Sequence, residues 1–304
     1  MWCNVKSIKH LGLIFFIEAI MSLWLVSIGI IEKDNNLFAI LIVLINSIAI
    51  FYFAISIFYK KEALLILIFY SAYLIRMVIA LHDTFSMDVV TDDVEDFRAS
   101  AEKYFYFNIV EFQGQYSFIA HFFGLIYKCF GIQRILLQHF NIIMMIIAGS
   151  VLYFVLSKIG VNNKSKFVAI IWMLFSPWAI ITTSVASREA VVILLIALSL
   201  YYFVSWFLEG QKKLFVISLV AVFFATLFHN GVIAVGIGYI FIFLIYKPKH
   251  NIFKITYKSI ILGVIILFVI VALYNNFGDT PLFGKLGGIS SINDIASRGA
   301  DYGG

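Results

Sequence analysis

Long apolar stretches recur along the whole chain and are separated by short polar or charged junctions. Nine of them have the length and apolarity of transmembrane helices: 11–31, 37–59, 64–82, 135–157, 167–187, 188–208, 214–228, 231–246 and 258–275. The seventh and eighth are short and share a tight turn at His229 and Asn230. The pattern predicts an all-α, polytopic membrane bundle that forms a single transmembrane domain over residues 1–304.

A tenth apolar stretch, 116–131, is short and interrupted by polar residues. If it does not span the membrane, every Lys-rich junction falls on one side, as the positive-inside rule requires. We therefore predict about nine spans, a cytoplasmic N-terminus and a large external loop over residues 83–134, in which 116–131 is an interfacial or re-entrant helix. The tail 276–304 is then external. It stops without a closing helix or a charged terminus, which is consistent with an incomplete chain.

The composition supports a polytopic, multi-pass membrane protein. Of the 304 residues, 62% are hydrophobic and only 13% are charged, which excludes an ordinary soluble domain. The net charge is +5, but no run of Lys and Arg is long enough to indicate nucleic-acid binding. Cys3 and Cys129 match no zinc or redox spacing, and the acidic residues match no calcium-loop pattern. We predict no metal site and no cofactor, although a divalent cation is compatible with the acidic residues.

The arginines and lysines are sorted differently. In the predicted orientation the lysine junctions face inward, whereas all five arginines lie in external loops or in the outer part of a span: Arg76, Arg98, Arg134, Arg188 and Arg298. The planar guanidinium binds phosphate or carboxylate in a bidentate way and stays charged when partly desolvated. The sorting favours an anionic headgroup held at the outer leaflet, with chance as the alternative for so few residues.

Two of these arginines lie where a charge is costly. Arg188 and the adjacent Glu189 open the sixth predicted span, just after a fifth span that Pro177 should kink. Either the pair snorkels to the interface with Ser187 as the helix N-cap, or Arg188 binds a phosphate of a lipid-linked substrate while Glu189 orients it. Arg76 lies about two turns inside the third span, which predicts a guanidinium facing the bundle interior, paired or liganded.

Candidate acid and base groups lie outside the spans. Asp92 and Asp93 belong to an acidic external loop, 82–104, where one carboxylate could take the proton of an acceptor hydroxyl and the other could position it or hold a divalent ion. The alternative is a solvated acidic loop. His229 could act as a general base, bind a sugar through a hydrogen bond, or cap its turn.

Three segments resemble bacterial polysaccharide polymerases of the Wzy/EpsG type: "SREAVVILLIALSLYYF", "LFHNGVIAVGIGY" and "IASRGADYGG". The resemblance covers residues 160–304. It implies transfer of an undecaprenyl-diphosphate-linked glycan to the non-reducing end of another repeat unit, outside the plasma membrane. It further implies that Arg188 and Arg298 hold diphosphates and that His229 is the third polar member of the site. The partners implied are a polyprenyl-linked oligosaccharide, the lipid bilayer and other polysaccharide assembly proteins.

A second resemblance leads to a related function. The stretch from "TDDVEDF" to "FSPWAIITTSVASRE" is similar to GT-C glycosyltransferases, which use polyprenyl-phosphate sugars. It implies that Asp92 is the catalytic base and Asp93 its neighbour. A transporter of polysaccharide or lipid-linked substrate is the third interpretation, because intramembrane arginines and broken helices also mark transport paths. A structural membrane subunit is the remaining alternative.

Overall fold

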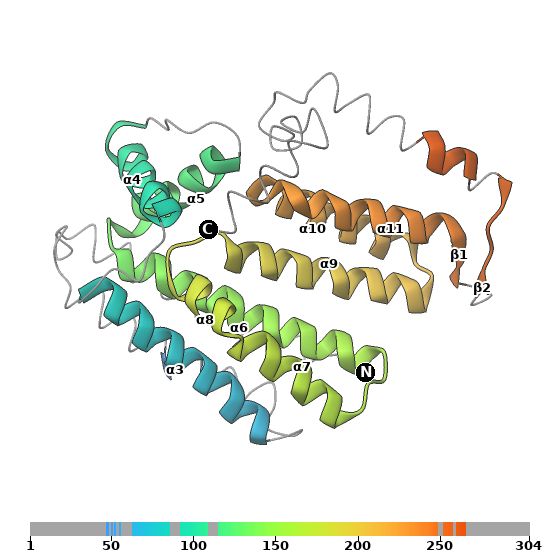
Figure 1. The fold of residues 1–304 in the computed structure, drawn as a ribbon, viewed down its shortest axis with the longest axis horizontal. Coiled ribbons are helices and arrows are strands. Elements are labelled where there is room, and N and C mark those ends of the chain that lie inside the picture. The colour runs from blue at the N-terminus through green and yellow to red at the C-terminus, as the bar shows by residue number, and fades with distance from the viewer. Residues whose placement is uncertain are drawn as a thin grey trace, which may run out of the picture. The chain divides into compact units, whose positions relative to one another are not determined.

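The computed structural model describes residues 47, 48, 50, 52, 55, 63–85, 92–108, 115–248, 252–257 and 260–265. Most of these residues are helical, as predicted (Figure 1). The helices are α3 (Ala63–Phe85), α4 (Asp92–Phe107), α5 (Gln115–Phe130), α6 (Arg134–Lys158), α7 (Asn163–Phe175), α8 (Pro177–Ser184), α9 (Glu189–Glu209), α10 (Lys212–Phe228), the 3₁₀ turn η1 (Asn230–Val232) and α11 (Ile233–Ile245). Two short antiparallel strands, β1 (Tyr246–Lys247) and β2 (Ile252–Phe253), form a hairpin that the apolar pattern did not predict.

Three of the described helices are long and apolar enough to cross a membrane: Leu64–Thr84 within α3, Arg134–Lys158 and Glu189–Glu209. The pair α7 and α8 makes a fourth if it is counted as one bent span. These helices match predicted spans to within a few residues and indicate a membrane-embedded protein. The count of nine stays a prediction, because 11–31 and most of 37–59 and 258–275 lie outside the described residues.

The predicted interruption at Pro177 is confirmed. Helix α7 ends at Phe175, α8 begins at Pro177, and the two are bent by 50°. Proline lacks the N–H that would continue the helix ladder, but its fixed φ suits the first turn of a new helix. Helix α8 has only eight residues, so the predicted fifth span ends early and a non-helical stretch precedes α9.

The predicted external loop contains two helices. The expected interfacial helix at 116–131 is α5, which has 16 residues. The acidic stretch, which we treated as a loop, forms α4 instead. Its buried residues Val94, Phe97 and Ala101 recur at helical spacing. Gly124 lets α4 and α5 approach closely, because a Cβ there would lie 2.4 Å from the Tyr104 ring.

The contacts between residues group the chain into two compact units, although the apolar pattern predicted one domain. The first unit comprises residues 1–111 and 119–197, the second 112–118 and 198–304, and α9 runs through the division. In the first unit, α6 is the central helix, with α3, α7 and α8 beside it (Figure 1). Helices α4 and α5 lie at the end where α6 begins, and Phe122 contacts Phe140 with ring centroids 5.7 Å apart.

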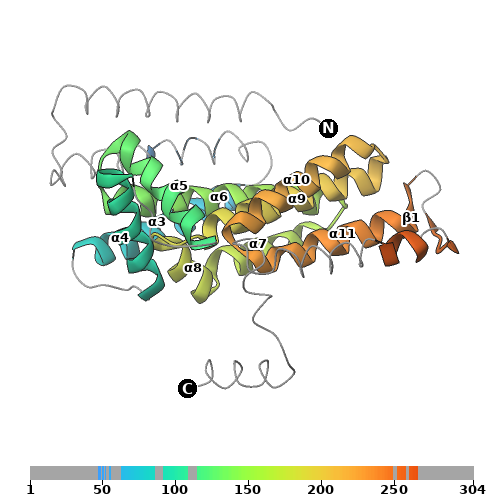
Figure 2. The same ribbon diagram turned by 90° about the horizontal axis from the view of Figure 1, so that it is seen from above.

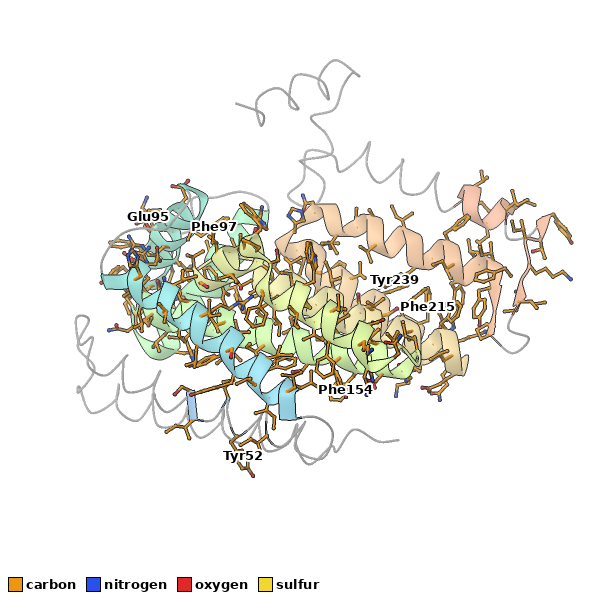
Figure 3. The ribbon with its side chains drawn as sticks, turned by 60° about the horizontal axis from the view of Figure 1, so that its bottom comes forward. Tyr52, Glu95, Phe97, Phe154, Phe215 and Tyr239 are labelled. Carbon is orange, nitrogen blue, oxygen red and sulfur yellow. The ribbon has the colours of Figure 1, made fainter. Side chains whose placement is uncertain are left out.

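The second unit has an aromatic core. Helices α10 and α11 run side by side (Figure 2) and join at the predicted turn, where α10 ends at Phe228. Phe203 stacks on Tyr239 with centroids 4.0 Å apart, and Phe215 stacks on Phe243 at 4.2 Å. Phe215 and Tyr239 are labelled in Figure 3. Stacked aromatic pairs of this kind stabilise a core beyond the area they bury.

Helix α6 packs tightly against α3 and α7 at Gly149, and this contact can be tested. A Cβ there would lie 3.0 Å from both Phe69 and Leu174, so Gly149→Leu should overpack the core and destabilise the protein by about 1–3 kcal/mol. Gly238→Leu is the control, because a Cβ at Gly238 meets nothing within 4 Å. Thermal unfolding in detergent should show a lower Tm for the first variant only, and equal Tm values would contradict this packing.

Candidate functional site

A buried, non-helical stretch connects α8 to α9. Val185, Ala186, Ser187 and Arg188 are all buried, so their backbone polar groups need partners within the protein. Asn141 of α6 supplies two of them: its side-chain Nδ2 donates to the carbonyl oxygens of Val185 at 2.7 Å and Ser187 at 2.6 Å. The stretch is thereby fixed to the central helix of the first unit.

Arg188 is held inside this unit. Only 7% of the residue is exposed, its Nε lies 3.6 Å from Oε1 of Glu189, and its guanidinium carbon lies 5.9 Å from the ring centroid of Phe97. Phe97 belongs to α4 and is labelled in Figure 3. A snorkelling arginine would expose its head group, so this alternative does not fit.

Ser187 does not act as the N-cap of α9. The carbonyl of Arg188 accepts the N–H of Val192 at 3.2 Å, which places Arg188 at the capping position. The Ser187 hydroxyl instead donates to the carbonyl of Thr182. The interface interpretation required an exposed Arg188 head group and Ser187 as the N-cap. The structure shows neither.

Arg76 faces the bundle interior, as predicted, and is fully buried. Its Nε donates to Oγ1 of Thr183 at 2.8 Å, and its Nη1 donates to the carbonyl of Ala72 at 3.1 Å. In the part of the chain that the structure describes, its buried Nη2 has no hydrogen-bond partner and no carboxylate forms an ion pair with it. A buried cation without a counter-charge is strongly unfavourable, so this guanidinium is suited to receive an anion.

Two other arginines are neutralised by carboxylates. Arg134 Nη2 donates to Oδ2 of buried Asp83 at 2.8 Å, and Gln138 Nε2 donates to the same oxygen at 2.5 Å. This ion pair ties the end of α3 to the start of α6. Arg98 pairs with Glu95 one turn away on α4. Among the described arginines, Arg98, Arg134 and Arg188 each lie close to a carboxylate, whereas Arg76 has only neutral partners.

The remaining sequence candidates lie elsewhere or are described only in part. Asp92 and Asp93 are the first residues of α4, and the structure describes their backbone but not their side chains. His229 is exposed in the second unit and is the N-cap residue of η1, without a side-chain capping bond. Arg298 lies outside the described residues. Of the predicted site, the first unit contains Arg76, Asp92, Asp93, Arg188 and Glu189.

The sequence analysis missed the polar side chains of α6. Gln138, His139 and Asn141 are buried in a helix of span length. Each has a polar partner in the first unit; for His139 Nε2 it is the Tyr73 hydroxyl, at 3.0 Å. Three polar residues within four positions of an apolar run were the available signal, since such residues are costly in a membrane.

Comparisons with protein-family models, with curated proteins and with solved structures found no match. The assignment of a function therefore depends on the chemistry of the site. Within the described ranges, no group of three or more His, Cys, Asp or Glu side chains could hold a metal ion. The expectations about metal and cofactor stay predictions.

The buried ion pair and the α4 ion pair should differ in their effect on stability. Asp83→Asn removes the buried carboxylate that pairs with Arg134, so we expect a loss of about 3 kcal/mol. Glu95→Gln removes the partner of Arg98 where both side chains are 29–46% exposed, and should change the stability by less than about 0.5 kcal/mol. Denaturant unfolding of both variants measures this, and similar losses would contradict a structural role for Asp83.

Proposed function

We propose that the protein is a membrane glycosyltransferase that polymerises polyprenyl-diphosphate-linked repeat units at the outer face of the plasma membrane, with its N-terminus in the cytoplasm. The observation that carries the proposal is the pair of buried arginines attached to the stretch between α8 and α9. Arg76 bonds to Thr183 on one side of this stretch, and Arg188 ends it. Buried guanidinium groups set among apolar helices suit the anionic head of a lipid-linked donor.

The transfer itself needs such a charge. The bond between the sugar C1 and the diphosphate oxygen breaks, a bond from C1 to an acceptor hydroxyl oxygen forms, and the polyprenyl diphosphate leaves with additional negative charge. A guanidinium fixed in a low-dielectric site stabilises that charge more strongly than water would. In this mechanism Arg188 binds the leaving diphosphate, and Glu189 orients the bound substrate. Oε1 of Glu189 lies 3.6 Å from Nε of Arg188.

A base must take the proton of the acceptor hydroxyl. His229, exposed at its turn, is the candidate in the polymerase mechanism, with Arg298 as a further diphosphate ligand. The GT-C alternative is supported by α4, because Asp92 and Asp93 open the same helix whose Phe97 contacts Arg188. There Asp92 would be the base and the donor a polyprenyl-phosphate sugar.

Glycan analysis of cells that lack the protein tests the proposal. We expect a single lipid-linked repeat to accumulate and the long surface polysaccharide to disappear. The wild type should restore the polymer, whereas Arg188→Ala should reduce it by about 100-fold or more, because a charge in contact with the leaving group is lost. Gel electrophoresis and mass spectrometry of the lipid-linked intermediates provide the measurement.

The control is Arg98→Ala, since Arg98 pairs with Glu95; this variant should restore the polymer fully. Accumulation of a repeat that lacks one sugar would favour the GT-C alternative. If the glycans of the deletion strain are unchanged and Arg188→Ala behaves as wild type, both enzyme functions are wrong, and transport or a structural role is left.

Arg76 should show opposite effects on stability and activity. Arg76→Met keeps an unbranched apolar side chain but removes a buried charge that has no carboxylate partner among the described residues. We expect the free energy of unfolding to stay the same or rise, while polymer formation falls by about 100-fold. Thermal unfolding and glycan analysis of one variant check both. A parallel loss of stability and activity would instead indicate that Arg76 serves only the fold.

A further inference from the structure

Asn141 is the fully buried residue that fixes the stretch before Arg188. Its Nδ2 carries two hydrogens, and it contacts two carbonyl oxygens, those of Val185 and Ser187. Because carbonyl oxygens only accept hydrogen bonds, the nitrogen of the amide must lie on this side. The geometry therefore also fixes Oδ1, the other end of the amide.

Oδ1 of Asn141 is a buried acceptor that has no hydrogen-bond partner among the residues the structure describes. A buried amide oxygen left in this state costs about as much as a lost hydrogen bond. Both donors of the same side chain are already used, so rotating the amide would place Oδ1 against two carbonyl oxygens and take the acceptors from both N–H groups. What Oδ1 lacks is a donor, such as a hydroxyl group.

Arg76 of α3 binds close to the segment that Asn141 binds, and it presents the complementary group. It bonds to Thr183, two residues before Val185, and leaves Nη2 as a buried donor with a positive charge. A ligand that satisfies both side chains carries an anionic oxygen and a hydroxyl group. A glycosyl phosphate or diphosphate has both, since sugar hydroxyls lie close to the C1–O–P linkage. A bare prenyl diphosphate has only the first.

We propose that Asn141 recognises the sugar next to the phosphate of the donor, by accepting a hydrogen bond from a hydroxyl at Oδ1, and positions Arg188 through Nδ2. This inference rests on the proposed function and assigns to Asn141 the recognition of the first sugar of its lipid-linked donor. The residue thus joins two tasks: one end of its amide holds the stretch between α8 and α9, and the other end selects the ligand.

Binding to two lipids that differ only in the sugar tests this. The purified full chain in nanodiscs is titrated with farnesyl diphosphate and with farnesyl-diphospho-N-acetylglucosamine. We expect the wild type to bind the sugar-bearing probe about three- to tenfold more tightly, the effect of one net hydrogen bond. Asn141→Ala should abolish this difference and weaken the binding of both probes, because the Arg188 segment loses its two donors.

The matched control is Ser150→Ala on the same helix, whose buried hydroxyl donates to the Ile146 carbonyl one turn away; it should keep the difference. Asn141→Ser, which retains one donor but is too short to reach the ligand, gives the same readout if the alanine variant does not fold. Equal binding of the two probes by the wild type, or an unchanged difference in Asn141→Ala, overturns the inference and leaves the proposed function standing. If neither probe binds, both the inference about Asn141 and the proposed function are wrong.

Discussion

The hydrogen bonds from Asn141 to Val185 and Ser187 are the interaction on which the arrangement of the first unit depends. A chain that leaves helical geometry inside an apolar bundle exposes carbonyl oxygens that neither lipid nor apolar side chains can satisfy. The two donors of a single amide allow α8 to stop and α9 to start within the bundle. Without them two buried carbonyl oxygens would lose their donor, and the stretch before Arg188 would lose its attachment to α6.

The described arginines are all predicted to lie toward the outer side of the membrane, and they differ from one another in their partners. Asp83 neutralises Arg134 and thereby ties α3 to α6, whereas Glu95 neutralises Arg98 within α4. Arg76 has only neutral partners among the described residues. The sorting of arginine from lysine along the sequence therefore has more than one cause: Arg134 serves an ion pair between helices, whereas Arg76 is buried without a carboxylate partner among the described residues.

The sequence was informative wherever a local pattern determines the structure. Apolar length predicted α3, α6 and α9 to within a few residues, and the missing N–H of Pro177 predicted the break between α7 and α8. Helix α4 was missed because its charged residues suggested a loop, although its buried positions recur at helical spacing. Asn141 could not be assigned a role, because its partners are backbone carbonyls 44 and 46 residues away, and no side-chain pattern encodes a bond to a backbone.

The break between α8 and α9 also brings the C-terminus of one helix close to the N-terminus of the next along the chain. Ser184 ends one helix and Glu189 begins the next, so partial charges of about half an elementary charge and opposite sign flank four residues. The positive end belongs to α9, a helix of 21 residues, and coincides with Arg188. The backbone dipole and the guanidinium thus act on an anion from the same place, and the part supplied by the peptide groups persists whatever side chain occupies position 188.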